Sequence, residues 1–202
     1  MIRQIKDGEL YFDGCSTLEL AEKYGTPLYV LSETDIVSRF SELRECFTDK
    51  YPDTRVAYAA KAFSTMAMYR LCQREGACID VVSAGELYTA IKAGFPPEMI
   101  EFNGNNKLPY EIEMALDYGI GRFIVDGLGE TDLIEAICRE KGKKASILFR
   151  ITPGVKSDSH DYMVTGKKDS KFGIPLDEDV LYPQIEKAIA SEYIDFLGFH
   201  FH

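Results

Sequence analysis

Short apolar runs typical of β-strands alternate with amphipathic helical patterns along most of this chain, and this alternation constrains the fold more than any other feature. In the helical stretches, apolar residues recur three and four positions apart, as at Leu133, Ile134, Ile137 and Cys138. A strand that leads through a helix into the next strand favours parallel pairing with right-handed crossovers. The predicted strands are Arg55 to Lys61, Cys78 to Ser83, Met99 to Asn103, Phe123 to Asp126, Ser146 to Ile151 and Phe196 to His202. The predicted helices are Ser64 to Arg74, Ala84 to Ala93, Tyr110 to Tyr118, Glu130 to Lys141 and Asp179 to Ser191.

Such near-regular units favour a (β/α)8 barrel with about six of its eight units present, and an open doubly wound sheet is the alternative. The sixth predicted strand, Phe196 to His202, ends at the last residue. An unclosed barrel exposes two apolar sheet edges, which is unfavourable. We therefore expect this chain to be a fragment of a longer protein.

The first 32 residues follow a different pattern. Gly8 to Gly14 is predicted to be a strand with turn signals, Thr17 to Tyr24 a short helix, and Pro27 to Leu31 another strand. Ser32 is a good N-cap for a long helix that runs to about Thr48. This segment therefore differs in organisation from the repeating units.

The chain is acidic, with a formal net charge of −10 over 202 residues, and 46% of its residues are hydrophobic. That hydrophobic share is ample for a folded core, while an acidic chain without a basic run is a poor candidate for binding nucleic acid or anionic membranes. The N-terminal stretch resembles neither a signal peptide nor a membrane span. The five cysteines are scattered without any C-x-x-C pair, which favours reduced thiols in a cytoplasmic protein over disulfides or zinc.

Lys61 is the residue with the most chemical potential. Side chains alternate along a strand, so Lys61 shares one face with the small residues Ala57 and Ala59 and has room beside it for a ligand. A partly desolvated lysine has a lowered pKa and is a candidate for Schiff-base formation. The alternative is a strand-end lysine that simply reaches solvent.

Polar side chains collect at the ends of the other predicted strands. Alternation places Arg150 on the inward face of its strand, and His200 and His202 on the inward face of the last strand. Convergence of such groups on one barrel mouth would be costly as mere packing, so it predicts a site. The polar residues at strand ends are Lys61, Asp80, Asn103, Asn105, Asp126, Arg150, His200 and His202.

Several of these residues have structural alternatives. Asp80 could pair with Arg150 or Lys61, and Ser83-Ala-Gly-Glu86 is a capping box. His200 and His202 could be half of a zinc site, but no acidic third ligand is evident, so no metal is expected. The segment Thr152 to Pro175 has no periodicity and is too long for an idle connection, which indicates an active-site loop.

A series of motifs runs in order through nearly the whole chain. They are Tyr58 to Lys61, Ile79 to Leu87, Ala93 to Pro97, Phe102 to Lys107, Phe149 to Pro153, Thr165 to Ile174 and Gly198 to His202. With these motifs the chain resembles the fold-type III pyridoxal-phosphate (PLP) decarboxylases, whose barrel is of the alanine racemase-like type. The ending Lys171-Phe-Gly-Ile-Pro175 of the long loop favours the diaminopimelate branch over the ornithine and arginine branches.

The resemblance implies decarboxylation of meso-2,6-diaminopimelate to L-lysine, with Lys61 as the residue that forms a Schiff base with PLP. It implies that His202 stacks on the cofactor ring, and that Asp80, Arg150 and His200 lie near the cofactor. Glu86, Asn103 and Ser83 would be further residues of the pocket. The cofactor supplies the electron sink of the reaction.

The resemblance also implies a division of the chain into residues 1–32, associated with a C-terminal β domain absent here, and a partial barrel over residues 33–202. A homodimer is implied for the full-length protein. Because the family's phosphate-binding glycines and pyridine-nitrogen partner come later in its sequence, this chain alone is expected to be inactive. The alternatives are a non-catalytic PLP-binding homeostasis protein, a decarboxylase of another basic amino acid, and a Schiff-base aldolase barrel.

Overall fold

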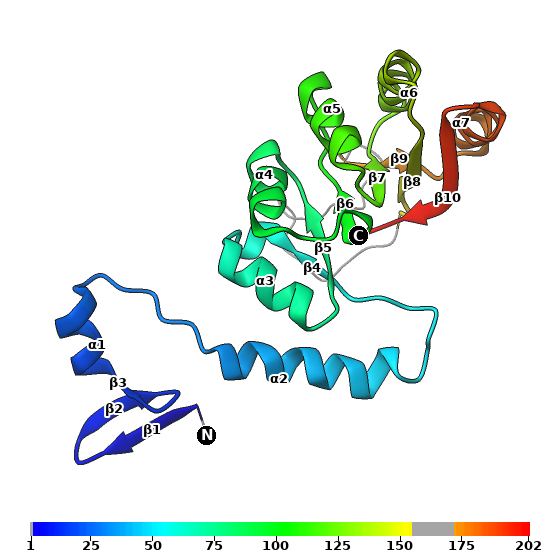
Figure 1. Ribbon diagram of the computed structural model, residues 1–202. Coiled ribbons are helices and arrows are strands. Elements are labelled where there is room, and N and C mark those ends of the chain that lie inside the picture. Colours follow the sequence, from blue (N-terminus) through cyan, green and yellow to red (C-terminus); the bar gives the residue numbers. More distant parts are fainter. Residues whose placement is uncertain (1, 155–171) are drawn as a thin grey trace. The chain divides into compact units, whose positions relative to one another are not determined.

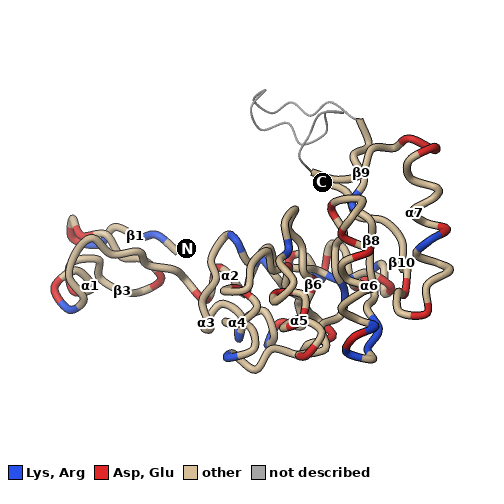
Figure 2. The backbone as a smooth tube through the Cα atoms, turned by 90° about the horizontal axis from the view of Figure 1, so that it is seen from above, with Lys and Arg blue, Asp and Glu red and all other residues tan. Residues whose placement is uncertain are grey.

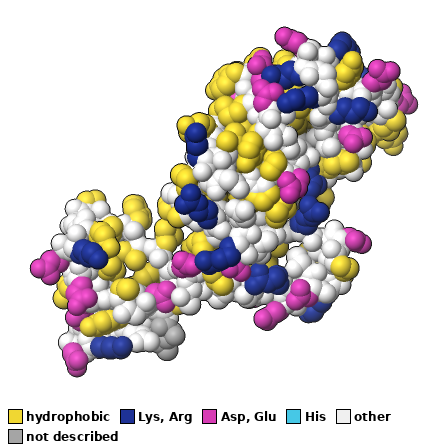
Figure 3. All heavy atoms as spheres, viewed as in Figure 1, with side chains coloured by type: hydrophobic (Ala, Val, Ile, Leu, Met, Phe, Trp, Pro, Cys, Tyr) yellow, Lys and Arg dark blue, Asp and Glu magenta, His cyan; other side chains and the backbone are white. Residues whose placement is uncertain are grey.

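The computed structural model describes residues 2–154 and 172–202 (Figure 1). The chain forms two compact units, one up to Val56 and one from Ala57 to the last residue. The predicted domain boundary at residue 32 stays a prediction. Acidic and basic residues are interspersed along the chain (Figure 2) and over the face seen in Figure 3. Among the described residues, no helix has the length and apolar character needed to cross a membrane.

The second unit is a parallel sheet with the strand order β10-β8-β7-β6-β5-β4. Each of these six strands therefore lies beside the one that comes before it in chain order. A doubly wound sheet would reverse direction at a switch point, whereas this steady progression is that of a barrel wall. Its strands are β4 (Ala57–Ala59), β5 (Cys78–Val81), β6 (Ile100–Phe102), β7 (Arg122–Val125), β8 (Ala145–Thr152) and β10 (Ile194–His200). The two-residue β9 (Ile174–Pro175) adds a parallel pairing to β8.

A helix follows each of the first four strands, and another precedes β10. They lie on one side of the sheet (Figure 1) and are α3 (Met66–Arg74), α4 (Ala84–Ala93), α5 (Pro109–Tyr118), α6 (Glu130–Lys141) and α7 (Glu178–Ala190). Thr65 and Ser83 cap α3 and α4 by accepting from backbone N–H groups three residues on. Two short 3₁₀ turns, η2 (Ala60–Ala62) and η3 (Pro97–Met99), complete the connections.

The two faces of the sheet differ in chemistry. Alternate strand residues such as Ile79, Phe102 and Phe123 are fully or almost fully buried under the helices, and each such side chain contributes about 1.5–3 kcal/mol to stability. On the other face, Asp80 pairs in register with Glu101, which pairs with Arg122. The inner face of the sheet is therefore polar where the predicted site lies.

The first unit contains a three-stranded antiparallel sheet of β1 (Arg3–Lys6), β2 (Glu9–Phe12) and β3 (Cys15–Ser16). Helix α1 (Thr17–Tyr24) follows, and Ser32 caps α2 (Glu33–Leu43), whose last turn continues as the π-helix η1 (Arg44–Thr48). The predicted strand Pro27 to Leu31 is wrong: this stretch is exposed and belongs to no helix or strand, and a strand needs a partner that the described residues do not provide.

Two strands of the parallel sheet also differ from the prediction. Strand β4 ends at Ala59, so Lys61 lies in the turn η2 and not on a strand. In β10 the pairing with β8 shifts between Phe196 and Gly198, and such a bulge interrupts the alternation of faces. Phe196 therefore lies beside Phe199, three residues on, with ring centroids 5.5 Å apart.

Candidate active site

The carboxyl end of β5 carries a carboxylate that the fold leaves half satisfied. Oδ2 of Asp80 accepts from the Asn103 amide at 3.4 Å, whereas Oδ1 is buried and has no partner among the described residues. Burial, followed by the negative charge of Glu101, raises the pKa of Asp80 from 3.8 to about 6. Asn103 and Lys61 act in the opposite direction, so the lysine lies within electrostatic reach of Asp80.

Lys61 follows β4 in the turn η2, whose backbone is held by hydrogen bonds. The carbonyl of Ala60, its neighbour, accepts from Phe63 N at 3.1 Å and from the Ser64 hydroxyl at 2.6 Å. The predicted desolvation of Lys61 is wrong, because the residue is exposed. In the described part of the chain β4 pairs with β5 alone, so the other edge of this strand is unpaired, and the Lys61 side chain is exposed. The amine is therefore open to a ligand while its backbone is held.

The predicted capping box at the start of α4 forms with one change of partner. Ser83 Oγ accepts from Glu86 N at 3.3 Å, and Glu86 Oε2 accepts from Val82 N at 2.6 Å in place of the N-cap nitrogen. Glu86 Oε1 lies 3.3 Å from the Ser64 hydroxyl, which belongs to the turn after Lys61. Glu86 therefore joins the cap of α4 to the segment that carries the lysine.

Arg150 lies in a second cluster, at the ends of β7 and β8. It is 8% exposed, donates from Nη1 to Asp126 Oδ2 at 3.1 Å, and stacks 4.6 Å from the centre of the Phe172 ring. Asp126 also accepts from Gly173 N. The alternative in which Asp80 pairs with Arg150 is therefore not what the structure shows: the neighbouring Asp126 takes that role because β7 lies directly beside β8.

His200 pairs in register with Arg150 and is half-buried. Its Nδ1 is buried and makes no hydrogen bond to the residues described. Burial, and then the positive charge of Arg150, lowers the pKa of His200, and Asp126 opposes this shift. His202 is exposed beyond the end of β10, and its predicted stacking role stays a prediction.

Within residues 2–154 and 172–202, no group of three His, Cys, Asp or Glu side chains is placed to hold a metal ion. The expectation that the protein binds no metal stays a prediction. The loop predicted to line the site falls largely outside the described residues, as do residues 165–171 of the motif Thr165 to Ile174. Its end, at Phe172 and Gly173, contacts Arg150 and Asp126.

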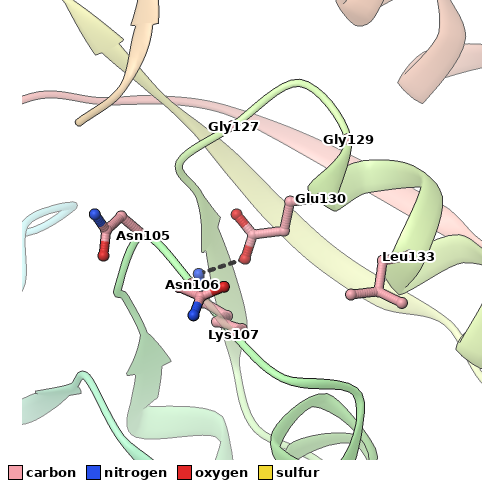
Figure 4. Close-up of a pocket in the computed structure, with 7 residues that line it drawn as sticks. All are labelled: Asn105, Asn106, Lys107, Gly127, Gly129, Glu130 and Leu133. Carbon is pink, nitrogen blue, oxygen red and sulfur yellow. Dashed lines mark hydrogen bonds and ion pairs between the residues drawn. The ribbon is translucent and has the colours of Figure 1, made fainter. Parts of the chain in front are cut away.

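Sequence reasoning missed a buried ion pair next to this cluster. Lys107 Nζ and Glu130 Oε1 are 2.6 Å apart, and the Lys107 side chain is 1% exposed. The pair lies in the wall of a pocket of about 250 Å³ between the loops after β6 and β7 (Figure 4), which Asn105 also lines. The available signal was the position of Lys107, directly after the strand-end run Asn103-Gly-Asn-Asn106. This signal was weak, because a lysine in a turn is ordinarily exposed.

The arrangement is suited to carbonyl and carboxylate chemistry. An accessible primary amine beside a carboxylate of raised pKa can condense with an aldehyde and exchange protons. A buried guanidinium, together with an imidazole nitrogen that has no partner among the residues described, can bind a polar, anionic ligand.

Comparisons with known proteins agree with this chemistry. A family model described as "Pyridoxal-dependent decarboxylase, pyridoxal binding domain" matches residues 33–202. The diaminopimelate decarboxylase of Bacillus methanolicus is 48% identical over 96% of this chain and 45% of its own length. That of Bacillus subtilis is 48% identical over 99% of this chain and 46% of its own length.

Solved structures show the same likeness. Diaminopimelate decarboxylase from Methanocaldococcus jannaschii in complex with L-lysine has a TM-score of 0.90 and 40% identity, covering 99% of this chain and 47% of that one. The Helicobacter pylori enzyme complexed with L-lysine has a TM-score of 0.83 and 33% identity over 92% of this chain and 46% of that one. The chain thus spans about half the length of the relatives it matches.

Proposed function

Because this chain belongs to the pyridoxal-dependent decarboxylase family, we propose that it binds pyridoxal 5′-phosphate and serves in the decarboxylation of meso-2,6-diaminopimelate to L-lysine. The main observation in support of this proposal is the arrangement at the strand ends, where the exposed amine of Lys61 lies within electrostatic reach of Asp80. The diaminopimelate branch is supported by the names of the relatives at 48% identity.

The residues present fit this cofactor. Two buried polar atoms, Asp80 Oδ1 and His200 Nδ1, have no partner within the described chain and so are available to a polar ligand. We assign Lys61 to carry the aldehyde carbon, and His200, His202, Arg150 and Asp80 to surround the ring and its substituents. When bound, PLP withdraws electrons from the substrate carbon that loses its carboxylate.

The chain's own contribution is to hold charge and protons in place. Above about pH 6 Asp80 is mostly ionised, while below that pH it holds a proton within electrostatic reach of Lys61. Ser64 and Glu86 fix the turn that bears Lys61. Asp126 partly neutralises Arg150 and orients its guanidinium beside His200.

We also propose that residues 1–32 form a segment separate from the cofactor-binding barrel, and that the protein acts as a cytoplasmic homodimer. The family match begins at residue 33, which supports this boundary, and all five cysteines are free, which supports a reducing compartment. Multi-angle light scattering of the protein encoded by the complete reading frame tests the dimer, and a monomer at micromolar concentration would contradict it.

Cofactor binding is tested by mixing the chain with PLP, reducing with borohydride and locating the modified lysine by peptide mass spectrometry. The expected result is a label on Lys61 that is absent from Lys61→Ala and still present in Lys92→Ala. The control variant changes an exposed lysine on α4. Equal label on several lysines would overturn the assignment.

The reaction is tested separately, with the protein encoded by the complete reading frame. Release of lysine from meso-diaminopimelate, faster than amine release from ornithine or arginine, supports the proposed substrate. Tight PLP binding without turnover of any of these amino acids would favour a non-catalytic PLP-binding protein instead.

A further inference from the structure

Three successive helices each have a glutamate in the first turn, and its carboxylate contacts the preceding strand–helix unit. Glu86 at the start of α4 accepts from Val82 N and from the Ser64 hydroxyl. Glu111 in the first turn of α5 accepts from Leu108 N and from Ala84 N, both at 2.8 Å. Each carboxylate thus joins its own loop to the loop or helix start of the unit before it.

The third of these carboxylates, Glu130 of α6, has a charged partner. Its Oε2 accepts from Asp126 N at 2.7 Å, and its Oε1 accepts from Lys107 Nζ at 2.6 Å (Figure 4). Lys107 also donates to the carbonyls of Gly104 at 2.8 Å and Ile124 at 2.6 Å. All three protons of this buried ammonium are therefore used, and the group is not available to a ligand.

The contacts of Glu130 continue into the candidate site. The backbone N–H that Glu130 holds belongs to Asp126, and the Asp126 carboxylate receives the Arg150 guanidinium at 3.1 Å. Arg150 in turn faces Phe172 and lies beside His200 in the register of β8 and β10. The contacts of Glu111, by comparison, run to the starts of α4 and α5.

We propose that Glu130 and Lys107 are positioning residues for Arg150, which fix the Asp126 carboxylate and through it the direction of the guanidinium. A buried ion pair that also satisfies backbone groups holds its segment in one geometry, and breaking one partner leaves an uncompensated charge. The inference rests on contacts within the chain and does not depend on the proposed decarboxylase chemistry.

The test compares Glu130→Gln with the matched change Glu111→Gln in the full 202-residue chain without ligand. Solvent exchange of the Arg150 Nη1 protons, which donate to Asp126, is measured by NMR, with Asp126→Asn as the positive control. A glutamine amide cannot accept from both Lys107 and Asp126 N, so exchange at Arg150 is expected to rise about tenfold, the factor for one lost charge-assisted hydrogen bond. Glu111→Gln is expected to lower thermal stability similarly but to change this exchange less than about twofold.

Equal exchange at Arg150 in the two glutamate variants would overturn the proposal, because a general loss of stability would then explain both. If Glu130→Gln does not fold, Lys107→Met provides the second test, since it keeps the Glu130 carboxylate. Exchange at Arg150 is expected to rise about threefold there, because the carboxylate retains its bond to Asp126 N. Wild-type exchange in Lys107→Met would likewise overturn the proposal.

Discussion

Asp80 accepts one hydrogen bond, from Asn103 at 3.4 Å, and keeps its other carboxylate oxygen buried without a partner in the described chain. The two residues come from neighbouring strands, with Asp80 on β5 and Asn103 directly after β6. Their contact stabilises the ionised carboxylate against the burial that raises its pKa. The proton affinity of this group therefore depends on an amide that lies 23 positions away in sequence.

Replacement of that amide is the first prediction. Asn103→Ala removes a hydrogen bond that lowers the pKa of Asp80, so this pKa is expected to rise above its value of about 6. The measurement is a pH titration of the Asp80 carboxyl carbon by NMR. Asn105→Ala, a change of an exposed residue in the same loop, is the control and should leave the titration unchanged. An unchanged or lower pKa in Asn103→Ala would contradict the assigned hydrogen bond.

Asp80 itself should reduce stability at neutral pH. Its pKa is raised from 3.8 to about 6 in the folded chain, so ionisation is penalised in the fold above about pH 6 and not below about pH 4. Asp80→Asn is therefore expected to increase the free energy of unfolding at pH 7.5 by up to about 3 kcal/mol, and to have little effect at pH 4. Urea unfolding at the two pH values measures this. Asp195→Asn, an exposed change on β10, is the control, and a loss of stability in Asp80→Asn at pH 7.5 would refute the prediction.

The titration of His200 should report the charge of Arg150. Arg150→Gln removes a positive charge that lowers the pKa of His200 and leaves the Asp126 carboxylate, which raises it. The lost positive charge and the remaining negative charge both favour the protonated imidazole, so the pKa of His200 is expected to increase. NMR titration of the imidazole signals follows this, with His200→Gln for assignment. Arg139→Gln, an exposed change on α6, should have no effect, and a fall in the pKa of His200 in Arg150→Gln would place Arg150 elsewhere.

A close backbone approach explains the glycine that ends the Gly119-Ile-Gly121 turn. A Cβ at Gly121 would lie 2.5 Å from the carbonyl oxygen of Glu98, and Gly121 N donates to Pro97 O at 2.8 Å. Gly121→Ala is therefore expected to lower the free energy of unfolding by about 1–3 kcal/mol. Gly127→Ala, which meets no atom within 4 Å, is the control in the same denaturation experiment. Equal stability of the two variants would show that the turn moves without cost.

Much of the architecture was predictable because it depends on local patterns. Period-two and period-3.6 hydrophobicity located six parallel strands of the sheet and the helices between them, and the Ser83 cap followed from residues three positions apart. Errors fell where a partner decides the outcome. Pro27 to Leu31 has strand composition without a pairing partner in the described chain, and one bulge in β10 interrupts the alternation of faces on which the prediction for this strand depended.

The candidate site divides in the same way. The alternation of elements was sufficient to predict that one end of a parallel sheet carries the site residues, because strand order and direction follow from it; these residues are Lys61, Asp80, Asn103, Arg150 and His200. Three features could be known from the three-dimensional arrangement alone: Arg150 pairs with Asp126, Lys107 is buried against Glu130, and Lys61 is exposed. These outcomes depend on distances and burial between residues far apart in sequence, and Coulomb and desolvation energies are set by those distances and not by spacing along the chain.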